Sequence, residues 1–115
     1  MNKNELLKNL CRHEVEQIEV PEWQDGEEPA IIHIRTLSGA QREEIEDIIV
    51  KNKVKSLRAL VFIHSVCDVD GNLMFDKADM AALNEGDGKV LDRVFHAAVK
   101  LNRMSDTDIA DAKKN

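Results

Sequence analysis

The side chains best suited to metal chemistry are three oxygen donors in a short acidic segment: Asp68, Asp70 and Asn72. Alternating oxygen ligands of this kind begin a calcium loop of the EF-hand type, which also needs a glycine at its sixth position and a glutamate at its twelfth. Counted from Asp68, those positions hold Leu73 and Asp79, so the two most restrictive requirements fail. We therefore interpret the segment as a tight turn whose geometry comes from Asp and Gly.

Two histidine–cysteine pairs, His64 with Cys67 and Cys11 with His13, supply four side chains that can ligate zinc. Structural zinc sites usually draw on Cys-x2–4-Cys and His-x3–5-His pairs, and neither spacing occurs here. We instead place His64 on the apolar stripe of a helix and interpret Cys67 as a small buried hydrophobic residue. We predict no metal site and no cofactor, and we expect neither calcium nor zinc to bind more tightly than about millimolar.

The residue types needed for catalysis lack the arrangement that catalysis requires. Ser65 follows His64 on a predicted helix, without the strand-to-helix turn and flanking glycines of a nucleophile elbow. Four acidic side chains are interpreted as a solvated helix flank opposite an isoleucine face: Glu43, Glu44, Glu46 and Asp47. We therefore predict no catalytic residues and no enzymatic activity.

Apolar side chains are the remaining candidates for function, as contacts to a partner. Four of them recur at helical spacing near the N-terminus: Leu6, Leu7, Leu10 and Cys11. Their stripe can dock on the protein's own core, on a second copy or on a partner. Trp23, the single tryptophan, is either a core plug at the end of a hairpin or an interface anchor. The candidate partner-binding residues are Leu6, Leu7, Leu10 and Trp23.

The elements that position these residues follow from changes in hydrophobic period. A helix is predicted within residues 1–13, and a β-hairpin within residues 14–36, where two extended runs flank a loop containing glycine and proline. We expect the hairpin to pair residues 15–20 with 30–36. Residues 38–112 are predicted to form a helical core.

Two capping patterns divide the first part of this helical core. Ser38 with Gln41 predicts a capping box, and an isoleucine face follows it at Ile45, Ile48 and Ile49. The central helix then either continues to about residue 66 or bends near Asn52. Asp76 with Asp79 repeats the capping pattern before a short helix that ends near Asn84.

The clearest amphipathic helix lies near the end of the chain and stops at Asn102. Its apolar face consists of Val90, Leu91, Val94, Ala97, Ala98 and Leu101, which we expect to be core. Ser105 with Asp108 predicts a final short helix. The chain is therefore expected to form a single domain, residues 1–115, of the helix-dominated α+β class: mainly α with a small N-terminal β-hairpin.

Composition narrows the environment in which this domain works. The net charge of −6 argues against binding to nucleic acid or to an anionic membrane. No signal-peptide pattern is present, and no apolar run approaches the roughly 20 residues that span a bilayer. We expect a cytoplasmic protein with reduced cysteines.

Four sequence phrases, taken in order and at these distances, resemble the small tail assembly chaperones of long-tailed bacteriophages. The phrases are Val20–Trp23, Ile32–Glu43, Ser65–Asn72 and Leu91–Asn102, and the resemblance covers roughly residues 16–112. It implies a mainly helical, non-catalytic protein of a phage or prophage, which acts in the cytoplasm of the bacterial host and is absent from the mature virion. The implied partner is the tape measure protein, which such chaperones keep soluble.

The resemblance also bears on assembly state. The chain is similar to the short form of the family, whose longer, frameshifted form contacts the tail tube protein through its extension. Homo-oligomers are known among the members, so self-association is expected. Two other functions stay open at this point: a calcium-responsive helical module built on residues 68–79, and a small structural component of the tail.

Overall fold

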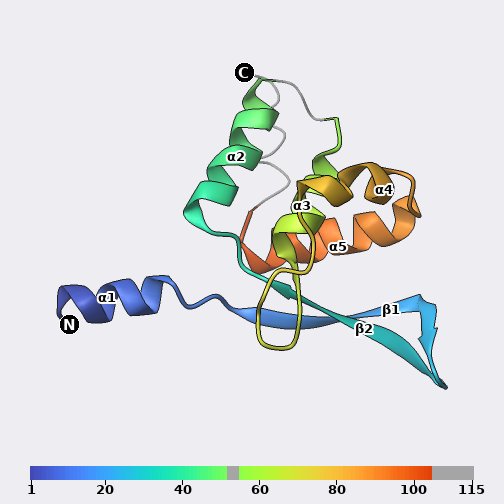
Figure 1. The fold of residues 1–115 in the computed structure, drawn as a ribbon, viewed down its shortest axis with the longest axis horizontal. Helices are drawn as coiled ribbons and strands as arrows, with labels where there is room; N and C mark the ends of the chain where they lie inside the picture. Colours follow the sequence, from blue (N-terminus) through green and yellow to red (C-terminus); the bar gives the residue numbers. More distant parts are fainter. Residues whose placement is uncertain (52–54, 105–115) are drawn as a thin grey trace.

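The structure is a computed structural model that describes residues 1–51 and 55–104. Its elements, in chain order, are α1 (Lys3–Leu10), β1 (Val15–Asp25), β2 (Glu28–Arg35), α2 (Gly39–Val50), α3 (Leu57–Ser65), β3 (Val66–Cys67), the 3-10 helix η1 (Lys77–Asp79), α4 (Met80–Asn84) and α5 (Gly88–Leu101). Helices α2 to α5 gather along one side of the β1–β2 hairpin, whereas α1 extends away from this body (Figure 1). The predicted helix-dominated α+β architecture is confirmed.

The N-terminal hairpin has the predicted pairing. Val15 lies opposite Arg35 and Val20 opposite Ala30, in an antiparallel ladder. The first strand of the predicted pairing ended at residue 20, but β1 continues past Pro21 to Asp25 across a register shift. A proline is tolerated there because β1 is an edge strand, where the missing N–H costs no ladder bond, and because the irregularity accommodates the ring.

A third strand, β3, was not expected from the sequence. Its two residues pair with β2, with Val66 opposite Ile34 and Cys67 opposite His33, so the sheet order is β1-β2-β3. Cys67 also forms an isolated bridge with Leu73. Two residues cannot display a period-2 pattern, so only the tertiary pairing reveals them.

The predicted caps form. Ser38 and Gln41 make a reciprocal capping box at the start of α2, and Asp76 and Asp79 do the same before η1. Helix α2 ends at Val50 and α3 begins at Leu57, so the alternative of one unbroken helix to about residue 66 is wrong. The other alternative, a bend near Asn52, falls outside the described residues, as does the helix predicted at Ser105 and Asp108.

Helix α3 is the centre of the core. Seven of its nine residues are buried: Leu57, Ala59, Leu60, Val61, Phe62, Ile63 and Ser65. The predicted isoleucine face of α2 packs against it through buried Ile45 and Ile49. On α5, Val90, Leu91, Val94 and Ala98 are buried as predicted, while Ala97 and Leu101 are half-buried. Among the described residues, no helix combines the length and apolarity needed to cross a membrane.

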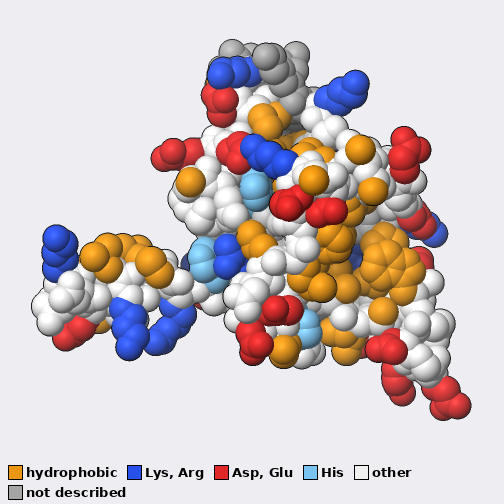
Figure 2. All heavy atoms as spheres, in the orientation of Figure 1, with side chains coloured by type: hydrophobic (Ala, Val, Ile, Leu, Met, Phe, Trp, Pro, Cys, Tyr) orange, Lys and Arg blue, Asp and Glu red, His pale blue; other side chains and the backbone are white. Residues whose placement is uncertain are grey.

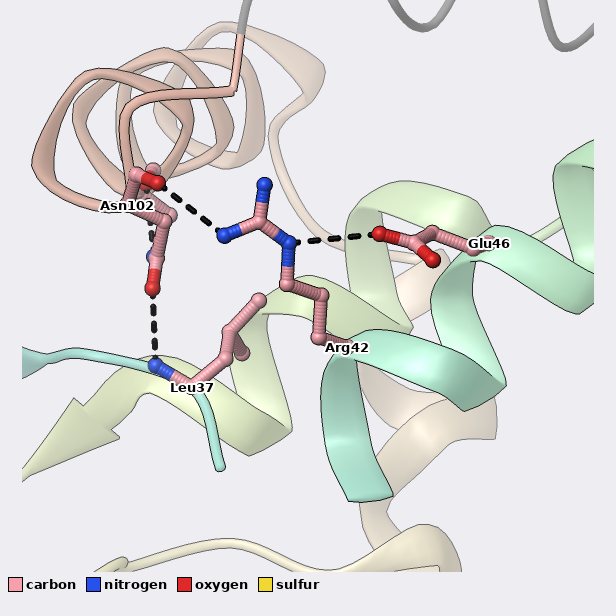
Figure 3. A network of polar contacts seen from close by, with 5 residues as sticks. Leu37, Arg42, Glu46 and Asn102 are labelled. Carbon is pink, nitrogen blue, oxygen red and sulfur yellow. Dashed lines mark hydrogen bonds and ion pairs between the residues drawn. The ribbon is translucent and has the colours of Figure 1, made fainter. Parts of the chain in front are cut away.

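Asn102 ends α5 and ties it to the start of α2 (Figure 3). Its side-chain oxygen accepts a hydrogen bond from the Leu37 N–H at 2.9 Å, and its backbone oxygen accepts one from Arg42 at 3.2 Å. The Arg42 Nε also donates to Glu46 at 3.2 Å. This network holds the N-terminal end of α2 against the C-terminal end of α5.

Candidate partner-binding surface

Helix α1 presents its apolar stripe to solvent. The Asn2 side chain caps the helix by accepting a hydrogen bond from the Glu5 N–H at 2.8 Å. No residue of the helix is buried, and the exposed fractions are 50% for Leu6 and Leu7 and 76% for Leu10. Figure 2 shows these hydrophobic side chains along one face of α1, with Lys and Arg side chains around them. Docking of the stripe on the protein's own core, one of the expected alternatives, is therefore wrong.

The segment after α1 is fixed to the end of the hairpin. The His13 Nδ1 atom lies 2.7 Å from the Thr36 carbonyl oxygen, and the Glu14 N–H donates to the Thr36 hydroxyl at 3.2 Å. The Thr36 N–H in turn donates to the Glu14 carbonyl at 3.0 Å. These bonds explain why α1 ends at Leu10 rather than continuing through the predicted range 1–13, because residues 13 and 14 are already held against Thr36, just before β1 begins at Val15.

An apolar groove lies between the hairpin, α3, α4 and α5, and we name it the Trp23 groove. It consists of two adjoining hollows of about 340 and 110 Å³, which share Trp23 and Phe62. The larger hollow is lined by Trp23, Ile31, Ile32, His33, Phe62, Val66, Cys67, Asp68, Met74 and Phe75. The smaller is lined by Trp23, Phe62, Ala82, Leu83, Gly86, Asp87, Val90 and Leu91.

Trp23 is part of the wall of this groove rather than a core plug. Its exposed fraction is 44%, so the core-plug interpretation is wrong. Ile31, on the paired strand, is likewise half exposed at 50%. At the floor, the rings of Phe62 and Phe75 meet edge to face with 5.3 Å between centroids. The surface therefore combines a packed aromatic floor with accessible apolar walls.

One ion pair holds the hairpin against α5 beside the groove. The Arg93 guanidinium donates from Nη2 to Glu22 Oε1 at 2.6 Å and from Nη1 to the other carboxylate oxygen. This hydrogen-bonded contact lowers the pKa of Glu22 and raises that of Arg93. Because Glu22 directly precedes Trp23, this ion pair holds the Trp23 segment of β1 beside α5.

Acidic side chains are frequent on the hairpin beside this groove and occur once in the lining of each hollow. Residues 14–28, which form β1 and the hairpin turn, contain seven Asp or Glu and no Lys or Arg. Acidic side chains cluster at the hairpin tip in Figure 2, and Asp68 and Asp87 line the two hollows. The sequence analysis missed this feature, although seven acidic residues and no basic residue among fifteen positions were a readable signal.

The segment considered for calcium is a hydrogen-bonded turn. The Asp68 carboxylate accepts hydrogen bonds from the N–H groups of Asp70 at 2.9 Å and Asn72 at 3.0 Å. Backbone donation from Asn72 is the main cause that lowers the pKa of Asp68. Gly71 supplies the positive φ of +88° that the turn needs. Within residues 1–51 and 55–104, no three His, Cys, Asp or Glu side chains gather as a metal-binding group.

The residues considered for zinc are not brought together. Cys67 is buried, and desolvation raises the pKa of its thiol, whereas Cys11 is exposed on α1. His13 bonds to Thr36, while the His64 Nε2 atom lies 3.2 Å from a Glu44 carboxylate oxygen.

Two side chains weighed for catalysis have structural positions. Glu44 contacts both His64 and the Lys77 ammonium, the latter at 2.7 Å, so its assignment to a solvated flank is wrong. Helix periodicity could not show that Lys77 of η1 reaches this side of α2. Ser65 is fully buried, which separates its hydroxyl from any substrate in solution.

An open apolar groove and an uncovered apolar helix on one small α+β body are the features of a protein-binding module. The chain belongs to the phage tail assembly chaperone family, whose family model matches residues 2–115. Among solved structures, the bacteriophage HK97 tail assembly chaperone is similar, with a TM-score of 0.65 and 23% sequence identity over 90% of this chain and 99% of that chain. No curated protein sequence matches this chain. The family assignment expected from the sequence phrases is confirmed, and a chaperone role is consistent with the prediction of no enzymatic activity.

Proposed function

We propose that this chaperone binds the tape measure protein in the cytoplasm of the bacterial host and keeps it soluble while the tail assembles. Membership of the family supports a role in tail assembly. A tape measure chain is long and largely helical, so its unassembled form exposes apolar stripes that need a cover. The observation that carries the proposal is the stripe of Leu6, Leu7 and Leu10, which the protein's own body leaves uncovered.

The physical logic is that of two amphipathic helices covering one another. An isolated helix of eight residues is marginal in water, because nucleation costs more than so few hydrogen bonds return. Docking the stripe on an apolar face of the tape measure protein stabilises both partners and removes leucine surface from water. Trp23 is the second proposed contact, since a partly exposed tryptophan beside apolar neighbours is typical of an interface anchor.

Co-expression with the tape measure protein of the same phage tests this proposal. The wild-type chaperone should hold the tape measure protein in the soluble fraction and co-purify with it. The double variant Leu6→Asp, Leu10→Asp should lose that ability while keeping its circular dichroism spectrum, because neither side chain is buried. Val69→Asp is the matched control, since it places the same charge on an exposed apolar residue outside both α1 and the groove.

Two outcomes distinguish an error in the proposed function from an error in the proposed binding surface. If the wild-type protein neither binds nor solubilises the tape measure protein, the proposed function is wrong. If the wild type succeeds and the double variant performs equally well, the function stands and another surface binds the partner.

The same proposal extends to the finished particle. A chaperone that acts before tube polymerisation should be absent from purified virions, which mass spectrometry of the particles can check. A longer, frameshifted form would add a contact to the tail tube protein. Detection of the chaperone at stoichiometric levels in the virion would favour a structural tail component instead.

A further inference from the structure

We propose that the Trp23 groove binds a basic amphipathic helix of the tape measure protein, a helix with two apolar side chains one turn apart and Lys or Arg beside them. This binding rests on the proposed function, because the tape measure protein is the helical partner that would supply such a segment. The residues of the groove decide both the apolar character and the charge of the segment that it accepts.

An irregularity in the hairpin builds the wall of the groove at Trp23. The ladder pairs Val20 with Ala30 and then Gln24 with Pro29, so three residues of β1, Trp23 among them, have no partner on β2. A bulge of this kind redirects the side chains that it carries. Here Trp23 lines both hollows while remaining partly exposed. The fold thus presents the indole to solvent beside an apolar floor.

The two adjoining hollows suit two neighbouring apolar side chains. Trp23 and Phe62 line both hollows, the larger continues to the exposed residues Ile31 and Met74, and the smaller continues to Leu83. Hydrophobic side chains gather between the hairpin and the helices in Figure 2. A helix projects residues i and i+4 from the same side, so it can place one apolar side chain in each hollow.

The ionised side chains in the lining of the groove are carboxylates. Asp68 lines the larger hollow and Asp87 the smaller, whereas Lys and Arg are absent from the lining within residues 1–51 and 55–104. In that part of the chain, neither aspartate forms an ion pair. The hairpin beside the groove adds the acidic segment of residues 14–28. A basic segment is therefore electrostatically favoured in this groove, and added salt should weaken its binding.

Each of the two lining carboxylates keeps an oxygen for a partner. The N–H groups of Asp70 and Asn72 both donate to Oδ1 of Asp68. The Lys89 N–H donates to Oδ1 of Asp87 at 2.9 Å, which caps the start of α5. Because an ionised carboxylate accepts through both oxygens, Oδ2 of each aspartate can accept from a Lys or Arg side chain of the bound helix.

The charge of the groove distinguishes it from α1. Residues 1–13 contain three basic side chains, Lys3, Lys8 and Arg12, and the single acidic side chain Glu5. A basic segment is thus attracted by the groove and repelled by α1, and an acidic segment the reverse. The two surfaces consequently select different segments of one partner.

The fluorescence of Trp23 makes the groove directly observable, because the chain has no other tryptophan and no tyrosine. Overlapping peptides of the tape measure protein of the same phage, with tryptophan replaced by phenylalanine, are titrated onto the full-length chaperone. Calorimetry measures the affinity. Basic amphipathic peptides should bind and shift the Trp23 emission to shorter wavelength. The same peptides with Lys and Arg replaced by Glu should bind far more weakly.

Paired variants test the role of the two carboxylates. Asp68→Asn with Asp87→Asn removes two charges, while asparagine preserves the turn and the helix cap. This variant should bind the basic peptides about threefold to tenfold more weakly and with less salt dependence. Glu43→Gln with Glu46→Gln is the matched control, since it removes two charges from exposed positions of α2 and should bind like the wild type.

The outcomes separate this proposal from the proposed function. If co-expression solubilises the tape measure protein but no basic peptide shifts the Trp23 emission, or Asp68→Asn with Asp87→Asn binds like the wild type, the groove proposal is wrong and the function stands. If co-expression fails, both are wrong. An emission shift with protein concentration alone, abolished by Leu6→Asp with Leu10→Asp, would assign the groove to α1 of a second copy and overturn the proposal.

Discussion

Glu44 shows how a single side chain can link three parts of this small body. Its carboxylate lies 2.7 Å from the Lys77 ammonium of η1 and 3.2 Å from His64 of α3. The hydrogen bond from Lys77, followed by that from His64, lowers the pKa of Glu44 from its usual value of 4.5, although partial burial acts in the opposite direction. The ionised form of Glu44 is therefore the form that the fold favours.

The pH dependence of Glu44→Gln tests this link. A folded-state pKa below the unfolded value means that the stabilisation is complete above the unfolded pKa and is lost as pH falls through the folded one. We expect the variant to melt at a lower temperature than the wild type at pH 7, and the difference to shrink below about pH 4.5. Glu43→Gln, an exposed neighbour on the same helix, should show little difference at either pH. A gap for Glu44→Gln that is equal at about pH 7 and pH 3 would contradict the assignment.

At the scale of elements, α3 and α5 form the packed unit on which the groove is built. Leu91 and Val94 of α5 pack in one cluster with Phe62 of α3 and Ile34 of β2. Leu91 of α5 and Phe62 of α3 therefore serve both the core and the groove, since both also line its smaller hollow. The floor of the groove is consequently built from residues that also pack in the core.

Truncation of Leu91 measures how much this packing contributes. Leu91→Ala should lower the free energy of unfolding by about 2–5 kcal/mol, because it removes transfer energy and leaves a cavity beside α3. Val69→Ala, at a residue that is 73% exposed, should change it by less than about 0.5 kcal/mol. Urea titrations followed by circular dichroism compare the two. A loss below about 0.5 kcal/mol for Leu91→Ala would mean that α5 does not supply the core.

On the scale of the whole molecule, charge and apolar surface are unevenly distributed. The basic α1 stands clear of an acidic body, joined to it at His13 and Thr36 (Figure 1). Because α1 buries no residue, its removal should cost the body almost no packing energy. The body and the helix therefore behave as separate units of stability.

Limited trypsin digestion in dilute solution tests this separation. Cleavage after Lys8 and Arg12 should precede cleavage within α5, because a short undocked helix opens far more readily than a packed one. The product that begins at His13 should retain the urea midpoint of the intact protein. Equal protection of α1 and α5 at concentrations where the protein is monomeric would show that α1 docks on its own body.

Much of the fold could be derived from sequence because local patterns report local physics. The hydrophobic period located the buried faces of α2 and α5, and the pairs Ser38–Gln41 and Asp76–Asp79 identified helix starts through hydrogen bonds that span three residues. The hairpin followed in the same way from two extended runs around a turn. The family was identified from the order and spacing of its sequence phrases.

The tertiary structure alone decided which of these faces meet. Strand β3 is too short to carry a pattern, and Glu44 is an ion-pair partner only because the fold brings Lys77 of η1 beside it. Trp23 and the stripe of α1 have the composition of core residues, yet both remain exposed. The physical reason is that a sequence pattern shows that an element has an apolar face, whereas the neighbour that covers this face, or leaves it open to a partner, is set by contacts between residues far apart in the chain.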